Sequence, residues 1–245
     1  MTDFIIVGNG DFLAKEIISE AIQHKCIIAL DGAADRLAAL GMLPHVVLGD
    51  FDSIQHAKER WGITDAKAPY QGKHGILIVP AKNQDLTDFD KALAYCDQHQ
   101  ANTITVICAY GGLADHHEAV QKAIRLAYRV DRPIVLHTEQ QTLRYAQNET
   151  LTLRGQPNDR AGVVTHGKGT FSSEGLAYEA TQLPDSFCNA LTSTEATLVI
   201  KGEALVIMPP QLTMQRNLMK LSEEERLKRR LRDLTGEHPL PGSYK

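Results

Sequence analysis

The chain has 245 residues, of which 43% are hydrophobic and 23% charged, as in folded globular proteins and unlike disordered or low-complexity chains. Its net charge of −4 leaves no broad basic field for binding nucleic acid. No apolar run reaches the length of a membrane span, and the four cysteines contain no CxxC pair. We therefore expect a cytoplasmic protein with reduced thiols that binds neither nucleic acid nor a membrane.

Short apolar runs alternate with helical patterns through residues 1–140. Helical spacing is clear between residues 13 and 22, where apolar residues recur three and four positions apart. We expect strands at residues 4–7, 27–30, 46–48, 76–79, 103–108 and 134–137. This alternation predicts an α/β domain with a mainly parallel sheet.

The sequence pattern changes at residue 141. Branched and alternating segments at residues 150–153, 161–165, 197–200 and 205–208 are separated by turn residues, among them 167–169 and 201–203. Residues 141–210 are therefore predicted to form a smaller all-β, sandwich-like domain. In residues 211–245, Ser222 and Glu225 form a capping box, which predicts a C-terminal helical tail.

Acidic residues follow two of the expected strands. Asp31 comes after residues 27–30, and Asp50 and Asp52 come after residues 46–48. Ligands of open α/β sheets bind at this carboxyl edge of the strands. In an extended stretch Asp50 and Asp52 would share one side, which suits Mg²⁺.

A purely structural role is equally open for this pair. In that alternative, Asp52 or Ser53 opens the helix that contains residues 57–61.

A second acidic segment, residues 83–90, follows the strand expected at residues 76–79. Thr87 and Asp90 approximate a capping box, so Asp85 and Asp88 would lie at the entrance of a helix. Aspartate at this position often only compensates the helix dipole, and that is the alternative, above all for Asp90. Two acidic loops at one sheet edge shift the balance toward a metal site.

Two glycine loops complete the candidate site: Gly8-Asn9-Gly10, and Gly111-Gly112 leading into Asp115-His116. Glycine allows a phosphate to approach the backbone amides closely. Each loop alone is weak evidence, because neither a GxGxxG nor a GxxxxGK[ST] motif is present. The adjacent His116 and His117 are typical of a helix surface rather than of a zinc site.

Taken in order, these motifs resemble the thiamine pyrophosphokinase family. Residues 31–36 (DGAADR) are similar to its DGGANR, and residues 49–54 match its GDFDSI. Residues 83–93 (NQDLTDFDKAL) are similar to its DQDxTDxxKAL, and residues 111–116 (GGLADH) to its GGRxDH. The resemblance spans about residues 4–208.

The resemblance implies a homodimer that transfers the diphosphoryl group of ATP to the hydroxyl of thiamine and releases AMP. Asp50, Asp52 and Asp88 would bind Mg²⁺, with Asp31 and Asp85 supporting the acidic site. The residues implied at the nucleotide are Gly8, Asn9, Gly10, Arg36, Gly111, Gly112, Asp115 and His116, and those implied at thiamine are Gln84, Cys188 and Asn189.

Three positions depart from the family pattern. Leu113 replaces an arginine, Val120 falls near a usual asparagine, and Cys188 replaces a serine. Leucine cannot bind a phosphate as arginine does, although Arg36 or Lys82 could compensate.

Three other functions therefore remain open. The chain could be a pyrophosphokinase for another alcohol such as a hydroxymethylpterin, or a nucleotide-binding protein without catalysis. A metal-dependent phosphohydrolase of the haloacid dehalogenase type is the third, although Gly49 separates the strand from Asp50.

Overall fold

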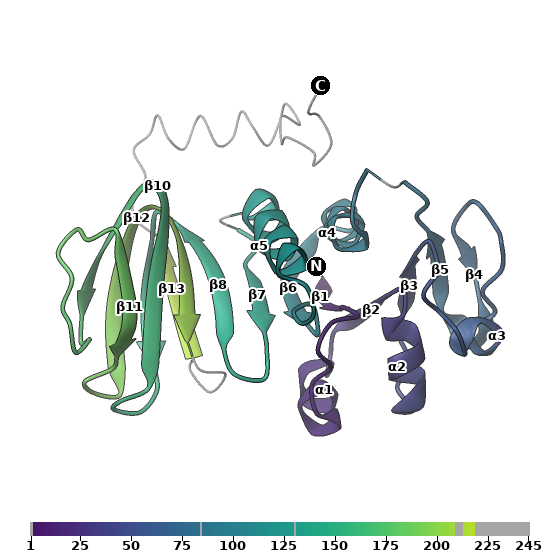
Figure 1. Ribbon diagram of the computed structural model, residues 1–245, viewed down its shortest axis with the longest axis horizontal. Helices are drawn as coiled ribbons and strands as arrows, with labels where there is room; N and C mark the ends of the chain where they lie inside the picture. The colour runs from purple at the N-terminus through teal and green to yellow at the C-terminus, as the bar shows by residue number, and fades with distance from the viewer. Residues whose placement is uncertain (1, 84, 130, 209–212, 219–245) are drawn as a thin grey trace. The chain divides into compact units, whose positions relative to one another are not determined.

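The structure is a computed structural model that describes residues 2–83, 85–129, 131–208 and 213–218 (Figure 1). The chain divides into two compact units, residues 1–139 and 140–245. Within the described residues, no helix combines the length and the apolar character needed to cross a membrane.

The first unit contains a mainly parallel sheet in the order β7-β6-β1-β2-β3-β5-β4. Only the short β4 runs antiparallel to its neighbour. The strands are β1 (Thr2–Val7), β2 (Cys26–Leu30), β3 (Val46–Gly49), β4 (Tyr70–Gln71), β5 (Leu77–Pro80), β6 (Ala101–Ile107) and β7 (Ile134–His137). The predicted α/β pattern is thus confirmed for this unit.

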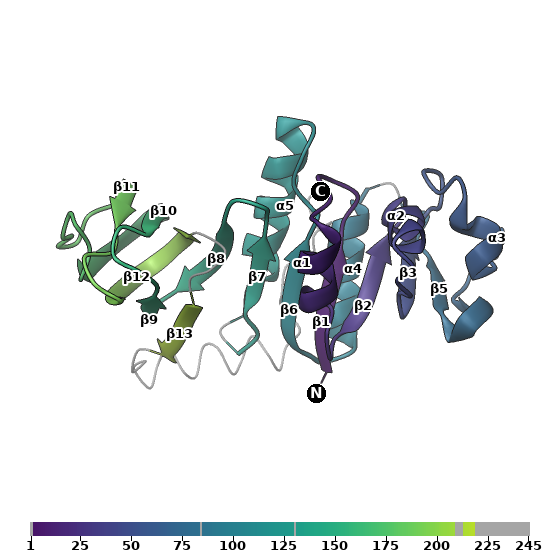
Figure 2. The ribbon, with the colours of Figure 1, turned by 90° about the horizontal axis from the view of Figure 1, so that it is seen from below.

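Helices cover both faces of this sheet, which explains why its central strands are apolar on both sides. Figures 1 and 2 show α4 and α5 on one face and α1 and α2 on the other. Ile5, Ile6 and Val7 of β1 are accordingly fully buried. The helices are α1 (Lys15–Ala21), α2 (Ala33–Ala39), α3 (Ala57–Trp61), α4 (Asp88–Gln98) and α5 (Ala114–Ala127), with a short 3₁₀ turn at Lys73–Gly75.

The strand order reverses at β1. The chain proceeds from β1 through β2 and β3 to β5 on one side, and then returns to place β6 on the other side of β1. The loops after β1 and β6 therefore lie side by side at the carboxyl edge, where doubly wound sheets bind their ligands. Both predicted glycine loops lie at this reversal point.

The second unit is built from strands throughout its described part. They are β8 (Thr142–Gln147), β9 (Glu149–Arg154), β10 (Arg160–Glu174), β11 (Asp185–Ala190), β12 (Glu195–Met208) and β13 (Thr213–Leu218). The first half of β12 pairs with β9 and the second half with β8, while β10 runs beside it. A buried apolar cluster that includes Leu151, Phe171 and Leu198 forms the core of this unit.

Two turns expected from glycine are wrong. Residues 197–200 and 205–208 belong to one strand, β12, and residues 167–169 lie inside β10. The reason is that Gly169 and Gly202 face each other so closely that a Cβ atom on Gly202 would overlap Gly169. The register of the β10–β12 pair also shifts between His166 and Thr170. The glycines therefore mark a bulge in a long strand pair.

Residues 211–245 were expected to form a helical tail, but their described part is a strand. Residues 213–218 form β13, which pairs antiparallel with β9 and so satisfies backbone groups of that strand. The helix expected from Ser222 lies outside the described residues.

Candidate functional site

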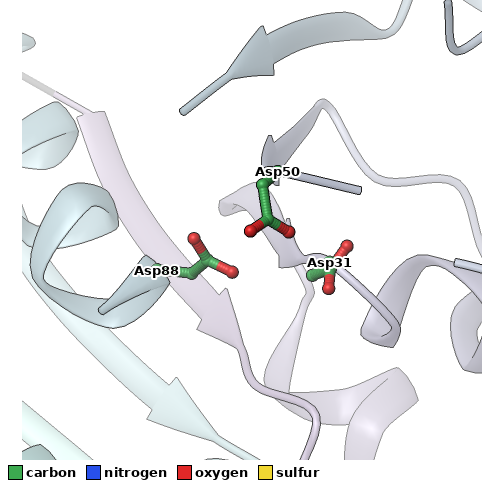
Figure 3. Close-up of side chains that lie close together, drawn as sticks. All are labelled: Asp31, Asp50 and Asp88. Atoms are coloured by element: carbon green, nitrogen blue, oxygen red, sulfur yellow. The ribbon is translucent and has the colours of Figure 1, made fainter. Parts of the chain in front are cut away.

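Three aspartates from separate elements converge at the carboxyl edge of the first unit. Asp31 follows β2, Asp50 follows β3, and Asp88 begins α4. One carboxylate oxygen of each lies within 4.8 Å of those of the other two, and Figure 3 shows the three side chains grouped together. Three carboxylates this close repel one another unless protons or a cation neutralise them.

Asp31 is the most buried of the three, with 8% of its surface exposed. Burial raises the pKa of its carboxyl group, and the charges of Asp88 and Asp52 add to this, while hydrogen bonds from Ser53 oppose it. Oδ2 accepts hydrogen bonds from the amide and the hydroxyl of Ser53. Oδ1 has no hydrogen-bond partner among the described residues, so it is free to bind a cation.

Asp88 is placed by the start of α4. Thr87 caps this helix, and the predicted capping box with Asp90 is confirmed: Thr87 Oγ1 accepts from the Asp90 amide, and Asp90 accepts from the Thr87 amide. Burial raises the pKa of Asp88, the ion pair with Lys91 at 2.9 Å lowers it, and the charges of Asp50 and Asp52 raise it. Lys91 also donates to the Ala81 carbonyl, which holds the preceding loop against α4.

An extended stretch would place Asp50 and Asp52 on the same side of the chain. The structure shows that they do not share one side. Phe51 has a φ of 67°, in the left-handed region, so the chain turns between the two aspartates. Phe51 is buried as expected, whereas Asp52 is exposed and lies outside the group of three carboxylates. The Asp52 amide donates to Asp50 Oδ1.

Asp35 of α2 holds the start of α3, a role that the sequence suggested for Asp52 or Ser53. His56, the residue before α3, makes no capping hydrogen bond with its own side chain. Its carboxylate accepts hydrogen bonds from the amides of Gln55, His56 and Ala57. Burial alone would raise the pKa of Asp35, but these amides bring it below its usual value. The separation of 20 positions between Asp35 and Gln55 explains why no local pattern revealed this contact.

The two glycine loops pack directly against each other. The amides of Gly8 and Gly10 donate to the carbonyls of Ile107 and Cys108, and a Cβ atom on Gly10 would overlap the Tyr110 carbonyl. A Cβ atom on Gly111 would likewise overlap Asp11. These glycines therefore permit close contact between two backbones.

Arg36 and Asn9 join the first glycine loop to the neighbouring elements. Arg36 donates to the Gly10 carbonyl at 2.5 Å and lies over the Phe12 ring, 4.1 Å from its centroid. Asn9 lies against Gly32, where any side chain would meet its amide group. Both predicted residues thus lie at the loop after β1.

The residues after the second loop divide into an exposed and a half-buried set. Leu113, Asp115 and His116 are exposed at the start of α5, and Asp115 accepts from the His116 amide at 2.8 Å. His117, which sequence reasoning assigned to the helix surface, instead accepts a hydrogen bond from the Gly111 amide.

Asp85, on the loop before α4, is exposed. Its amide donates to the side chain of Asn83 at 2.8 Å. Lys82 is exposed as well, and Gln84 lies outside the described residues.

In the second unit, Cys188 is exposed and lines a cavity of about 370 Å³. Arg160 donates to its Sγ atom at 3.0 Å, and Phe187 lines the same cavity. Asn189 is 1% exposed, and its amide group is used within the fold by Tyr178 and Ser186. Of the predicted pair, only Cys188 is therefore presented to this cavity.

Comparison with known proteins is consistent with this geometry. Residues 18–136, which contain all three aspartates, match the family model of the thiamin pyrophosphokinase catalytic domain. Over 112 residues the chain is 32% identical to the thiamine pyrophosphokinase of Bacillus subtilis, a match that covers 46% of this chain and 49% of that protein. The matched segment thus spans about half the length of this curated relative.

Solved thiamin pyrophosphokinases share the fold. The structure from Bacillus subtilis has a TM-score of 0.71 at 20% identity, covering 85% of this chain and 99% of that one. The structure from Geobacillus thermodenitrificans has a TM-score of 0.69 at 22% identity, covering 85% and 97%. The structure from Candida albicans has a TM-score of 0.70 at 14% identity, covering 84% and 89%. The chain therefore shares the fold of these solved thiamin pyrophosphokinases, and its residues 18–136 resemble the catalytic domain of that family.

Proposed function

We propose that this chain is a thiamine diphosphokinase, which transfers the diphosphoryl group of ATP to the hydroxyl of thiamine and releases AMP. The observation that carries the proposal is the convergence of Asp31, Asp50 and Asp88, each with a carboxylate oxygen within 4.8 Å of the others, beside the strand-order reversal. The family match of residues 18–136 supports the same reaction.

Mg²⁺ is the proposed metal. The donor set fits it, because Mg²⁺ binds oxygen ligands such as carboxylates and completes its coordination with water and substrate phosphates. Asp31, Asp50 and Asp88 would hold the ion, and Asp52 is near enough for its charge to raise the pKa of both Asp31 and Asp88. When bound, the ion would neutralise charge on the transferring phosphoryl groups.

The nucleotide is proposed to lie at the reversal point between β1 and β6. Its phosphates would meet the loop of Gly8, Asn9 and Gly10 and the loop of Gly111 and Gly112. Asp115 and His116, exposed at the start of α5, are available for the nucleoside. Arg36, held by the Gly10 carbonyl, supplies a positive charge beside the first loop.

Alignment and charge neutralisation carry most of the proposed catalysis, as in other phosphoryl transfers. The alcohol oxygen would attack the β-phosphorus in line with departing AMP. Asp85 or Asp88 would orient the alcohol, and no single general base is assigned.

The acceptor is proposed to contact Cys188, which lines the cavity of the second unit, whereas the buried Asn189 would act only by holding this segment in place. Arg160, which lines the cavity beside Cys188, would repel the cationic ring of thiamine. That arrangement favours a neutral or anionic alcohol as an alternative acceptor. We also propose a homodimer with the site at the subunit interface. A cytoplasmic location is proposed as well, and the four free cysteines support it.

Incubation with ATP, Mg²⁺ and thiamine tests the proposal when AMP, ADP and the diphosphorylated product are quantified separately. We expect AMP and thiamine diphosphate in equal amounts, with none after chelation of Mg²⁺. Release of AMP only with another alcohol would reassign the acceptor. Tight ATP binding without turnover of any alcohol would contradict the enzymatic proposal, and a trapped aspartyl-phosphate would indicate a phosphohydrolase.

A further inference from the structure

His117 contacts the second glycine loop in two ways. Its Nε2 atom accepts a hydrogen bond of 2.8 Å from the Gly111 amide. Its ring also stacks on Tyr110, with centroids 4.6 Å apart and an interplanar angle of 12°. Because Nε2 accepts here, the ring proton of the neutral imidazole is assigned to Nδ1.

Tyr110 and Gly111 carry this contact to the first glycine loop. The Tyr110 carbonyl accepts a hydrogen bond of 2.5 Å from the Asp11 amide. The missing Cβ atoms of Gly10 and Gly111 leave the two loops in direct backbone contact. A displacement of the second loop would therefore displace the first one as well.

The Gly111 amide is occupied by this contact. A backbone amide that donates to a side chain within the protein is not available to a phosphate at the same time. Its part in the site is therefore to fix the turn, in which Gly111 and Gly112 both have positive φ values, of 117° and 80°. Such a turn can aim its other backbone groups at a ligand.

We propose that His117 is a positioning residue, which holds both glycine loops in the arrangement that binds the phosphates of ATP. It acts through the Gly111 amide and the Tyr110 ring and does not contact the reacting atoms. This inference rests on the proposed binding of ATP at the reversal point, and not on the identity of the acceptor.

Three variants test this role. His117→Leu keeps an apolar side chain beside Tyr110 and removes the acceptor, whereas His117→Gln offers a carbonyl oxygen to the Gly111 amide. The matched control is His99→Leu, because His99 also stacks on a tyrosine, Tyr95, and lies at the end of α4. ATP binding is measured by titration calorimetry with Mg²⁺ and without an acceptor, and the unfolding temperature of each variant is recorded.

We expect His117→Leu to weaken ATP binding about tenfold, the effect of losing one hydrogen bond of about 1.4 kcal/mol. His117→Gln should bind within about threefold of the natural protein, and His99→Leu should match it. In turnover assays the KM for ATP should rise more than kcat falls, with the KM for the acceptor unchanged. A merely structural role would lower the unfolding temperature without this split or this rescue.

Unchanged ATP binding in His117→Leu would overturn the inference. So would a folded His117→Gln whose ATP affinity does not recover, or a natural protein that binds no ATP. If His117→Leu fails to fold, Tyr110→Leu removes the stacked ring, and unchanged ATP binding in that variant would also overturn it. A natural protein that binds ATP without forming AMP would contradict the proposed function and leave this inference standing.

Discussion

Gly49 lies beside Asp31 so closely that a Cβ atom on Gly49 would stand 3.1 Å from the Cβ atom of Asp31. The same atom would stand 3.2 Å from Oδ2 of Asp88. The φ of Gly49 is 154°, which L residues rarely adopt. Gly49, the last residue of β3, therefore leaves open the space in which the carboxylates of Asp31 and Asp88 approach each other.

Gly49→Ala should disable the site. Its methyl group would enter the space between Asp31 and Asp88, so Mg²⁺-dependent AMP formation should fall by more than about tenfold. Gly41→Ala is the matched control, since Gly41 has a φ of 75° but no atom near its missing Cβ. Both variants should lose about 1–3 kcal/mol of stability from backbone strain. Equal activity in the two variants would contradict the crowding argument.

Asp31→Asn should stabilise the metal-free protein. The substitution removes a buried negative charge that faces Asp50 and Asp88, and the new amide can donate to them. Calorimetry without divalent ions should show an unfolding temperature a few degrees higher than that of the natural protein. A gain of about 1 kcal/mol in stability raises the unfolding temperature of chains of about 150–250 residues by roughly 2–4 °C. Added Mg²⁺ should then stabilise this variant less than the natural protein. The exposed Asp65→Asn serves as control, and a fall in the unfolding temperature of Asp31→Asn would count against repulsion.

Asp35→Ala should lower the free energy of unfolding by about 0.5–2 kcal/mol at neutral pH, because α3 loses its cap. The folded pKa of Asp35 lies below its unfolded value of about 3.9. Its stabilisation is therefore present above that value and is lost as the pH falls through the folded pKa. Urea unfolding should show the difference between natural protein and variant shrinking below about pH 4. A difference that stays constant in acid would contradict the assignment.

A thiol reagent at pH 8 should distinguish the cysteines. Burial raises the pKa of Cys96 to about 12 and that of Cys108 to about 11, so neither forms the reactive thiolate. Burial also raises the pKa of Cys26, whereas Cys188 is exposed. One fast thiol is expected, and Cys188→Ser should remove it. A fast thiol that persists in this variant would show that a buried cysteine is accessible.

Local sequence patterns were sufficient where short-range contacts decide the structure. The capping box of Thr87 and Asp90 needs only four consecutive residues, and it places Asp88 as expected. The apolar runs also predicted the parallel strands that bring Asp31 and Asp50 to one edge.

Backbone conformation and distant contacts were beyond such patterns. The left-handed φ of Phe51 turns Asp52 out of the carboxylate group, although strand alternation predicts that it joins Asp50. The contact between Gly111 and His117 depends on how α5 begins, and the facing glycines of β10 and β12 look like turns when each strand is considered alone.

Binding of Mn²⁺, a spectroscopic substitute for Mg²⁺, tests most directly whether the three carboxylates hold a divalent ion. Electron paramagnetic resonance in the presence of AMP should show one ion bound to the natural protein and to Asp65→Asn. Asp50→Asn should bind it at least about tenfold more weakly, since even residues beyond the metal ligands typically change affinity 10–100-fold. Equal Mn²⁺ affinity in the natural protein and Asp50→Asn would contradict the account.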